Sequence, residues 1–230
     1  MLQGLNFKTY RFETIVIEEV NPKYYIEKKY VRNVEIYILE TNNNVNTFQL
    51  LVIEFQFSDD DNALGKLIKQ ISYLFDELII DVDDNGKIIK LRNIHFLQLR
   101  WLKIKSKLSL SHKGDVVENY FKQIDELLNS EDKLIVFLED YNMFGLLFHG
   151  LWNNLEGKIK RLLKNNVTEI ISIKKNKEKI TQEIFAESLD DTDFLIYRGF
   201  CEYKNGNYEE GFIETKTHKN HLKYSLLWVN

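Results

Sequence analysis

The stretch Phe48-Gln-Leu-Leu-Val-Ile-Glu-Phe-Gln-Phe57 decides the fold class of this chain. It is rich in β-branched and aromatic residues, which is typical of strands. Four of its apolar residues are spaced two apart: Leu51, Ile53, Phe55 and Phe57. Because strand side chains alternate between faces, this spacing predicts a strand with that set against a core.

Runs of the same composition lie at both ends of the chain. Tyr10–Glu19 and Tyr30–Glu40 precede the first stretch, and Asn42-Asn43-Asn44 predicts a tight turn because Asn tolerates positive φ. Near the C-terminus three further runs predict a β meander with a hairpin turn at Asn205-Gly206: Phe194–Tyr203, Tyr208–Thr217 and Leu222–Val229.

The middle of the chain is predicted to be mainly helical. The apolar residues Leu97, Trp101, Ile104 and Leu108 follow helical spacing. Between Leu155 and Glu187 the pattern is weaker; it predicts a strand over Val167–Ile173 and a short helix over Ile180–Phe185. We therefore expect one α+β domain over 1–230, an antiparallel sheet built from N-terminal and C-terminal strands with a helical insertion. Its parts are β structure over 7–58, a helix and hairpin over 62–92, helices over 94–165 and a β meander over 193–229.

The composition indicates which partners and which cellular compartment to expect. The chain has 230 residues and a net charge of −4, which argues against nucleic acid as a partner. Cys201 is its one cysteine, so an intrachain disulfide is impossible, as suits a reducing cytosol. It shows no signal peptide and no apolar run near the roughly 20 residues of a bilayer span. We expect a cytoplasmic protein with no membrane partner, from a bacterium with AT-rich codons.

The stretch Asp81-Val-Asp-Asp-Asn-Gly86 matches the start of a calcium-binding loop. The twelfth position should be a bidentate Glu and is Arg92, a cation that would repel the ion. Asn-Gly between two apolar runs is also the strongest short signal of a hairpin. We therefore interpret Asp81, Asp83 and Asn85 as hairpin residues and predict no metal site.

Other reactive residues are scattered along the sequence. His218 and His221 could bind zinc with Glu214 if a hairpin folded back, but two histidines make no closed site. An enzyme would depend on His149 with Cys201 or Asp140, and nothing in the sequence pairs them. We predict no catalytic residue, no cofactor and no enzymatic activity.

The segment from Asp81 to Lys107 resembles a stretch that recurs in bacterial proteins. The shared residues are Gly86, Ile88, Asn93, Arg100 and Trp101. The resemblance implies a bacterial accessory protein and assigns no activity or catalytic residue.

Two functional hypotheses remain. The first is binding of another protein, in the manner of an immunity protein, an effector adaptor or a secretion-associated chaperone; an acidic surface would predict a basic partner. Tyrosine is enriched at interface hot spots, and six tyrosines lie on or near predicted strands: Tyr24, Tyr25, Tyr30, Tyr37, Tyr203 and Tyr208. Ordinary tyrosines of a β surface are the alternative explanation.

The second hypothesis is a carrier of a small apolar ligand. A strongly bent antiparallel sheet can enclose an apolar cavity in the manner of a barrel. The apolar run near the middle of the chain could line it, through Met143, Phe144, Phe148 and Trp152.

Overall fold

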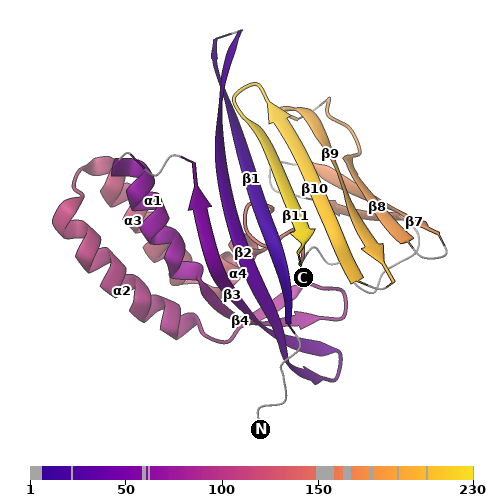
Figure 1. Cartoon of the computed structure of the whole chain (residues 1–230), viewed down its shortest axis with the longest axis horizontal. Helices are drawn as coiled ribbons and strands as arrows, with labels where there is room; N and C mark the ends of the chain where they lie inside the picture. Colours follow the sequence, from indigo (N-terminus) through magenta and orange to yellow (C-terminus); the bar gives the residue numbers. More distant parts are fainter. Residues whose placement is uncertain are drawn as a thin grey trace.

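The protein is α+β, with one antiparallel sheet and a helical insertion (Figure 1). The computed structural model describes residues 7–21, 23–58, 61, 63–148, 158–162, 167–176, 179–190, 192–205 and 207–229. The strands of the described residues are β1 (Phe7–Asn21), β2 (Tyr24–Asn42), β3 (Val45–Phe57), β4 (Glu77–Asp83), β5 (Ile88–Leu91), β6 (Lys158–Leu162), β7 (Thr168–Lys175), β8 (Lys179–Ala186), β9 (Phe194–Lys204), β10 (Asn207–Thr217) and β11 (His221–Trp228). The helices are α1 (Ala63–Ser72), the 3-10 turn η1 (Tyr73–Phe75), α2 (Ile94–Ser111), α3 (Asp115–Leu128) and α4 (Glu131–Leu138).

The two ends of the chain meet in the middle of the sheet. Its order is β5-β4-β3-β2-β1-β11-β10-β9-β8-β7-β6. Strand β1 pairs with β11 from Tyr10 opposite Trp228 to Ile17 opposite His221, and every adjacent pair of strands is antiparallel. The prediction of one sheet completed by both termini is confirmed.

Turn chemistry explains the hairpins that the sequence predicted. Asn43 and Asn44 have φ of 41° and 70°, Asn205 has φ of 50°, and Gly86 has φ of 80°. Few residues other than Asn and Gly occupy this left-handed region without strain. These residues therefore fix the β2–β3, β9–β10 and β4–β5 connections; Gly206 lies outside the described residues.

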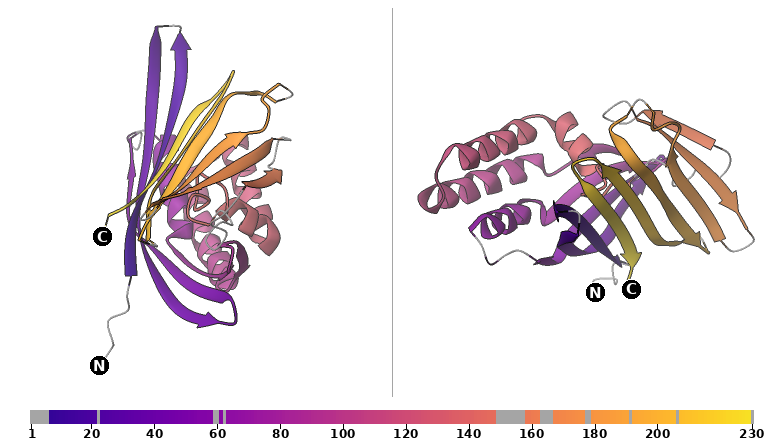
Figure 2. Two further views of the ribbon diagram at one scale, coloured as in Figure 1. Left: turned by 90° about the vertical axis from the view of Figure 1, so that its right-hand side faces the viewer. Right: turned by 90° about the horizontal axis from the view of Figure 1, so that it is seen from above.

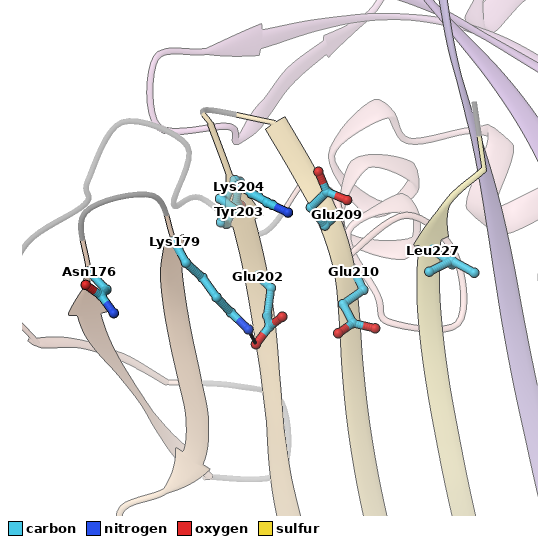
Figure 3. Close-up of a pocket in the computed structure, with 8 residues that line it drawn as sticks. All are labelled: Asn176, Lys179, Glu202, Tyr203, Lys204, Glu209, Glu210 and Leu227. Carbon is cyan, nitrogen blue, oxygen red and sulfur yellow. Dashed lines mark ion pairs between the residues drawn. The ribbon is translucent and has the colours of Figure 1, made fainter.

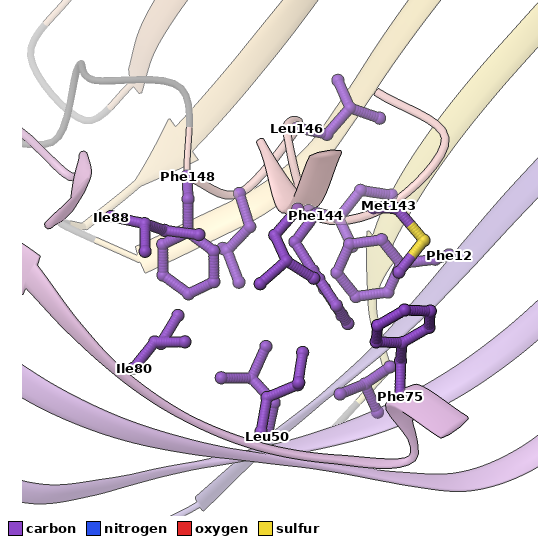
Figure 4. Close-up of a cluster of buried hydrophobic side chains, with 14 of the residues drawn as sticks. Phe12, Leu50, Phe75, Ile80, Ile88, Met143, Phe144, Leu146 and Phe148 are labelled. Carbon is purple, nitrogen blue, oxygen red and sulfur yellow. The ribbon is translucent and has the colours of Figure 1, made fainter. Parts of the chain in front are cut away.

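The core lies between one face of the sheet and the helical insertion. That inner face carries Tyr10, Phe12, Val34 and Leu50, all of them buried. The helices cover the N-terminal half of the sheet on this side (Figure 2). The segment Met143–Phe148, which follows α4, is buried throughout and points its phenyl rings at the sheet (Figure 4).

A β-bulge in β3 makes part of the predicted face assignment wrong. Ile53 was expected in the core and is 55% exposed, whereas Leu50 is buried. The register between β2 and β3 shifts between Asn33 and Val34, where Ile53 is the extra residue on β3. One inserted residue reverses the side on which all later side chains fall.

Two helical predictions are also wrong. Part of the range 94–165 is strand, since β6 covers Lys158–Leu162, and the expected helix at Ile180–Phe185 lies in β8. There Gln182 and Ile184 are buried while their neighbours are more exposed, which is the period of a strand. Pairing with β7 and β9 on both sides outweighs the local helical spacing. The strand predicted over Val167–Ile173 is confirmed as β7.

Candidate protein-binding surface

The stretch 81–86, which resembles the start of a calcium-binding loop, forms a hairpin that is stabilised by its own side chains. A carboxylate oxygen of Asp81 lies 2.7 Å from Nε of Arg92, the residue that replaces the expected Glu. Thr47 donates its hydroxyl to the same carboxylate at 2.8 Å. Asp83 accepts the backbone N–H groups of Asn85 and Lys87 and so stabilises the turn. Both carboxylates are thus used by the fold, and the described residues contain no group of three metal-ligating side chains.

The outer face of the C-terminal strands contains an Arg–Glu–His cluster. Glu214 accepts hydrogen bonds from Arg198 and lies 2.9 Å from Nε2 of His221, while His218 is exposed in the turn. Burial raises the pKa of the Glu214 carboxyl, but the bonds to His221 and Arg198 outweigh it and bring the pKa below its usual value. The cluster therefore works as a cross-strand ion network, and it brings His221 but not a second imidazole to Glu214.

The structure describes two of the three residues proposed for an enzyme, Cys201 and Asp140. Cys201 is fully buried in β9, where it accepts a hydrogen bond from Tyr208 at 3.3 Å. Asp140 lies in the turn after α4, where its backbone carbonyl accepts the N–H of Gly145. His149 is outside the described residues. The buried position of Cys201 differs from the partly exposed, electropositive settings that are typical of catalytic cysteines.

The six candidate tyrosines fall into three groups. Tyr203 and Tyr208 are buried, so neither offers its ring to a partner. Tyr30 and Tyr37 are half-buried: the ring of Tyr30 packs on Phe57, and Tyr37 donates its hydroxyl to Glu35 at 2.6 Å. Tyr24 and Tyr25 remain, with 57% and 52% of their surface exposed.

Tyr24 and Tyr25 lie near the end of a two-stranded ribbon that projects from the sheet, which we term the β1–β2 arm. It consists of Glu18–Asn21 and Lys23–Lys28 and extends beyond all other strands in Figures 1 and 2. Strand β11 stops pairing with β1 at Ile17, and β3 pairs with β2 only from Tyr30 onward. Both edges of the arm are therefore free of neighbouring strands within the described structure.

The arm carries several large apolar side chains that are exposed to solvent. Its exposed large side chains are Val20, Tyr24, Tyr25 and Ile26. A β-bulge between Glu19 and Asn21 disturbs the ladder beside them. Such bulges discourage indiscriminate edge pairing while leaving side chains available. The arm was not predictable from the sequence, because it is formed only where β1 and β2 extend beyond β11 and β3.

One face of the arm is acidic. Glu19 is paired with Tyr25 in the register, and Glu27 is paired with Ile17, so these two carboxylates flank the Tyr25 ring. Lys28 forms an ion pair with Glu18 at 2.8 Å on the other face. Within the described structure neither Glu19 nor Glu27 forms an ion pair, so both leave carboxylate charge beside Tyr25.

A hollow of about 740 Å³ lies on the outer face of the C-terminal strands (Figure 3). Its walls are mostly charged: Asn176, Lys179, Glu202, Tyr203, Lys204, Glu209, Glu210 and Leu227. Lys179 and Glu202 form an ion pair across it at 2.5 Å. An apolar ligand would desolvate these groups without pairing them, so the hollow does not suit one.

Replacing Glu210 by Gln is expected to stabilise the protein slightly, by about 0.5 kcal/mol or less at neutral pH. Burial and the neighbouring Glu202 carboxylate raise the pKa of Glu210, so its ionised form disfavours folding. The gain should disappear as the pH falls through that raised pKa, because the wild-type carboxyl then becomes neutral too. Thermal melts of both proteins from pH 7 to pH 4 test this; a gain independent of pH would contradict it.

Comparison with known proteins identifies a likeness of fold only. No family model matches this sequence. No curated protein matches it either. A solved structure described as "Lipid-protein interactions in lipovitellin" superposes with a TM-score of 0.51 at 9% identity. The match covers 97% of this chain and 25% of that one, so this chain spans about a quarter of its length.

The helices of the described chain include none with the length and apolar character needed to cross a bilayer.

Proposed function

We propose that this chain is a non-catalytic binding protein that docks another protein through the β1–β2 arm. The carrying observation is the exposure of Val20, Tyr24, Tyr25 and Ile26 on a ribbon that leaves the body of the sheet. Apolar surface that lies outside the core does not stabilise the free protein, and it becomes buried when a partner binds. Tyrosine offers a large contact area at low cost in side-chain entropy.

The chemistry of the arm supports one kind of partner. Glu19 and Glu27 beside Tyr25 favour a surface with Lys or Arg around an apolar pocket. The free edge of β1 beyond Ile17 could also pair with an extended segment of that partner. The partner we propose is therefore a basic protein with an apolar pocket or an exposed strand.

A double variant of the arm tests this function. Tyr24→Ser with Tyr25→Ser is expected to weaken binding about 100-fold or more, since hot-spot tyrosines each contribute about 2 kcal/mol or more. The wild type, tagged at its C-terminus, is first used to isolate a partner from its own cells at near-equal yield. The affinity of the purified pair is then measured by titration calorimetry.

The matched control is Leu195→Ser with Leu227→Ser, which removes two exposed apolar side chains on β9 and β11. It should bind the partner as the wild type does. A partner held equally well by the arm variant, or a wild type that isolates no stoichiometric partner, would contradict the proposal. Raising the salt concentration should weaken binding if the acidic face contributes.

A second candidate function is transport of an apolar ligand. It is supported by the likeness of the sheet to a structure that concerns lipid–protein interactions. Met143, Phe144 and Phe148 are buried in the core, so a ligand would have to displace them; Trp152 lies outside the described residues. Solvent extraction of the purified protein followed by mass spectrometry tests this, and a lipid at equal molar amount would favour it over the arm.

The finer roles are also proposals: an immunity protein, an effector adaptor or a secretion-associated chaperone in the bacterial cytoplasm. Each of them acts by holding one protein partner, which the arm could do without any catalytic group. The identity of the isolated partner separates them, because a toxin, a translocated effector and a component of a secretion apparatus are distinct classes of protein.

A further inference from the structure

Helix α2 has apolar residues on two opposite faces. Leu97, Trp101 and Leu108 point inward and are buried in the core. On the outward side Leu99 and Leu102 are each 61% exposed and Leu110 is 82% exposed. An ordinary surface helix shows polar residues there. The outward leucines therefore have no role in the fold of the described chain.

All charged residues of α2 and of the turn that follows it are basic. The segment 94–113 contains five cations and no Asp or Glu: Arg100, Lys103, Lys105, Lys107 and Lys113. Arg100 pairs with Asp76, and Lys105 pairs with Asp125 at 2.6 Å, so those two are neutralised within the helical layer. Lys103, Lys107 and Lys113 are exposed and form no ion pair with a described residue. This concentrates positive charge in a protein whose net charge is −4.

The position of α2 makes this face accessible. The helix runs along the margin of the molecule, on the far side of the helical layer from β11 (Figure 1). Trp101 holds it there, since its indole N–H donates to Asp125 of α3 at 2.7 Å and its ring packs edge-on against Phe121. Leu99, Leu102, Lys103 and Lys107 thus lie on a helix that is anchored to α3, whereas Lys113 lies in the turn after it.

Two kinds of partner would complement an apolar, cationic helix face: an acidic protein or an anionic bilayer surface. Protein interfaces are rich in Tyr, Trp and Arg and poor in Lys. Here the outward face consists mainly of Leu, Lys and Ser, with Phe96 at its edge. At a bilayer, leucines enter the acyl boundary while lysine stems extend back to the headgroups. The composition favours the bilayer.

We propose that the outward face of α2 docks the protein onto anionic phospholipid. The sequence argued against a membrane partner because it holds no spanning segment, and a helix lying in the interface needs none. Asp115 and Glu118 follow at the Leu110 end and repel anionic lipid, so insertion is deepest around Leu99 and Leu102. This inference goes beyond the proposed function and uses a surface separate from the arm.

Cosedimentation with vesicles tests the proposal. The wild type is expected to bind vesicles of phosphatidylcholine mixed with phosphatidylserine, and to bind phosphatidylcholine alone far more weakly. Leu99→Ser with Leu102→Ser should lower the partition coefficient about tenfold or more, because both side chains lose their apolar insertion. Lys103→Ser and Lys107→Ser should each lower it roughly fivefold on the anionic vesicles only. Added salt should weaken binding of the wild type.

Control variants separate this face from the rest of the molecule. Leu195→Ser with Leu227→Ser removes comparable exposed leucines from the sheet and should bind vesicles normally. The arm variant Tyr24→Ser with Tyr25→Ser should also bind normally, so failure of the proposed function leaves this result intact. All substituted positions are exposed, and matching thermal melts confirm that each variant is folded.

Two results would overturn the proposal. One is a wild-type protein that does not bind anionic vesicles. The other is undiminished binding by the Leu99 and Leu102 variant, which would place the contact elsewhere. If the wild type does not bind vesicles but binds a poly-aspartate peptide through the same leucines and lysines, the partner of the outward face of α2 is an acidic protein and not a bilayer.

Discussion

Replacing Phe144 by Ala is expected to lower the free energy of unfolding by about 3–5 kcal/mol, the range for buried aromatic rings. The ring is 1% exposed and meets Phe12 of β1 edge-on, with centroids 5.4 Å apart. The guanidinium of Arg32 lies over it at 5.8 Å. Removing the ring leaves a cavity between the sheet and the segment after α4, and it uncovers that cation. Urea denaturation monitored by circular dichroism measures the loss.

The control for this prediction is Leu110→Ala, which removes apolar atoms that are already in water. Its effect on stability should stay within about 0.5 kcal/mol. A loss below about 1 kcal/mol for Phe144→Ala would mean that Met143–Phe148 does not fill the inner face of the sheet. That result would also strengthen the carrier hypothesis, because a segment that detaches at little cost could give way to a ligand.

The sequence predicted the fold class because its local signals agree with the tertiary structure. Asn-rich turns and period-two runs at both ends specify a meander, and the meander closes through β1 and β11. The sequence-based prediction was wrong where a tertiary contact overrides the local pattern of residues. The bulge at Ile53 reverses the alternation of the residues on either side of it, and pairing on both sides makes β8 a strand. Neither effect leaves a mark in residue types.

The binding surface was predictable only in part. Tyrosine enrichment on strands pointed to Tyr24 and Tyr25, which are exposed, and equally to Tyr203 and Tyr208, which are buried. Residue type cannot separate them, because β-branched and aromatic residues suit both faces of a strand. What separates them is where neighbouring strands end, a property of the whole sheet. The run of cations without acids in α2 was visible in the sequence, but its outward direction was not.

Gly145 explains how Met143–Phe148 reaches the sheet. After α4 the chain turns back sharply: Phe144 donates its N–H to the carbonyl of Leu138, and Gly145 donates to that of Asp140. A Cβ on Gly145 would lie 2.2 Å from the carbonyl oxygen of Glu139 and 2.7 Å from the carbonyl carbon of Asp140. Both are backbone atoms, which cannot rotate away as a side chain does. The turn therefore requires glycine because of space rather than φ.

Gly145→Ala is consequently expected to destabilise the protein by about 3 kcal/mol, the upper end for overpacking, because α4 and the buried segment must separate. Gly114→Ala is the matched control: a Cβ there meets nothing within 4 Å, and its φ of +117° imposes only local strain in the α2–α3 turn. It should cost about 1–2 kcal/mol and leave the rings of Phe144 and Phe148 in place. Near-ultraviolet circular dichroism of the native proteins should differ from wild type for Gly145→Ala only. Equal losses for the two variants, with unchanged aromatic spectra, would show that the close approach of Gly145 to Glu139 does not hold the buried segment against the sheet.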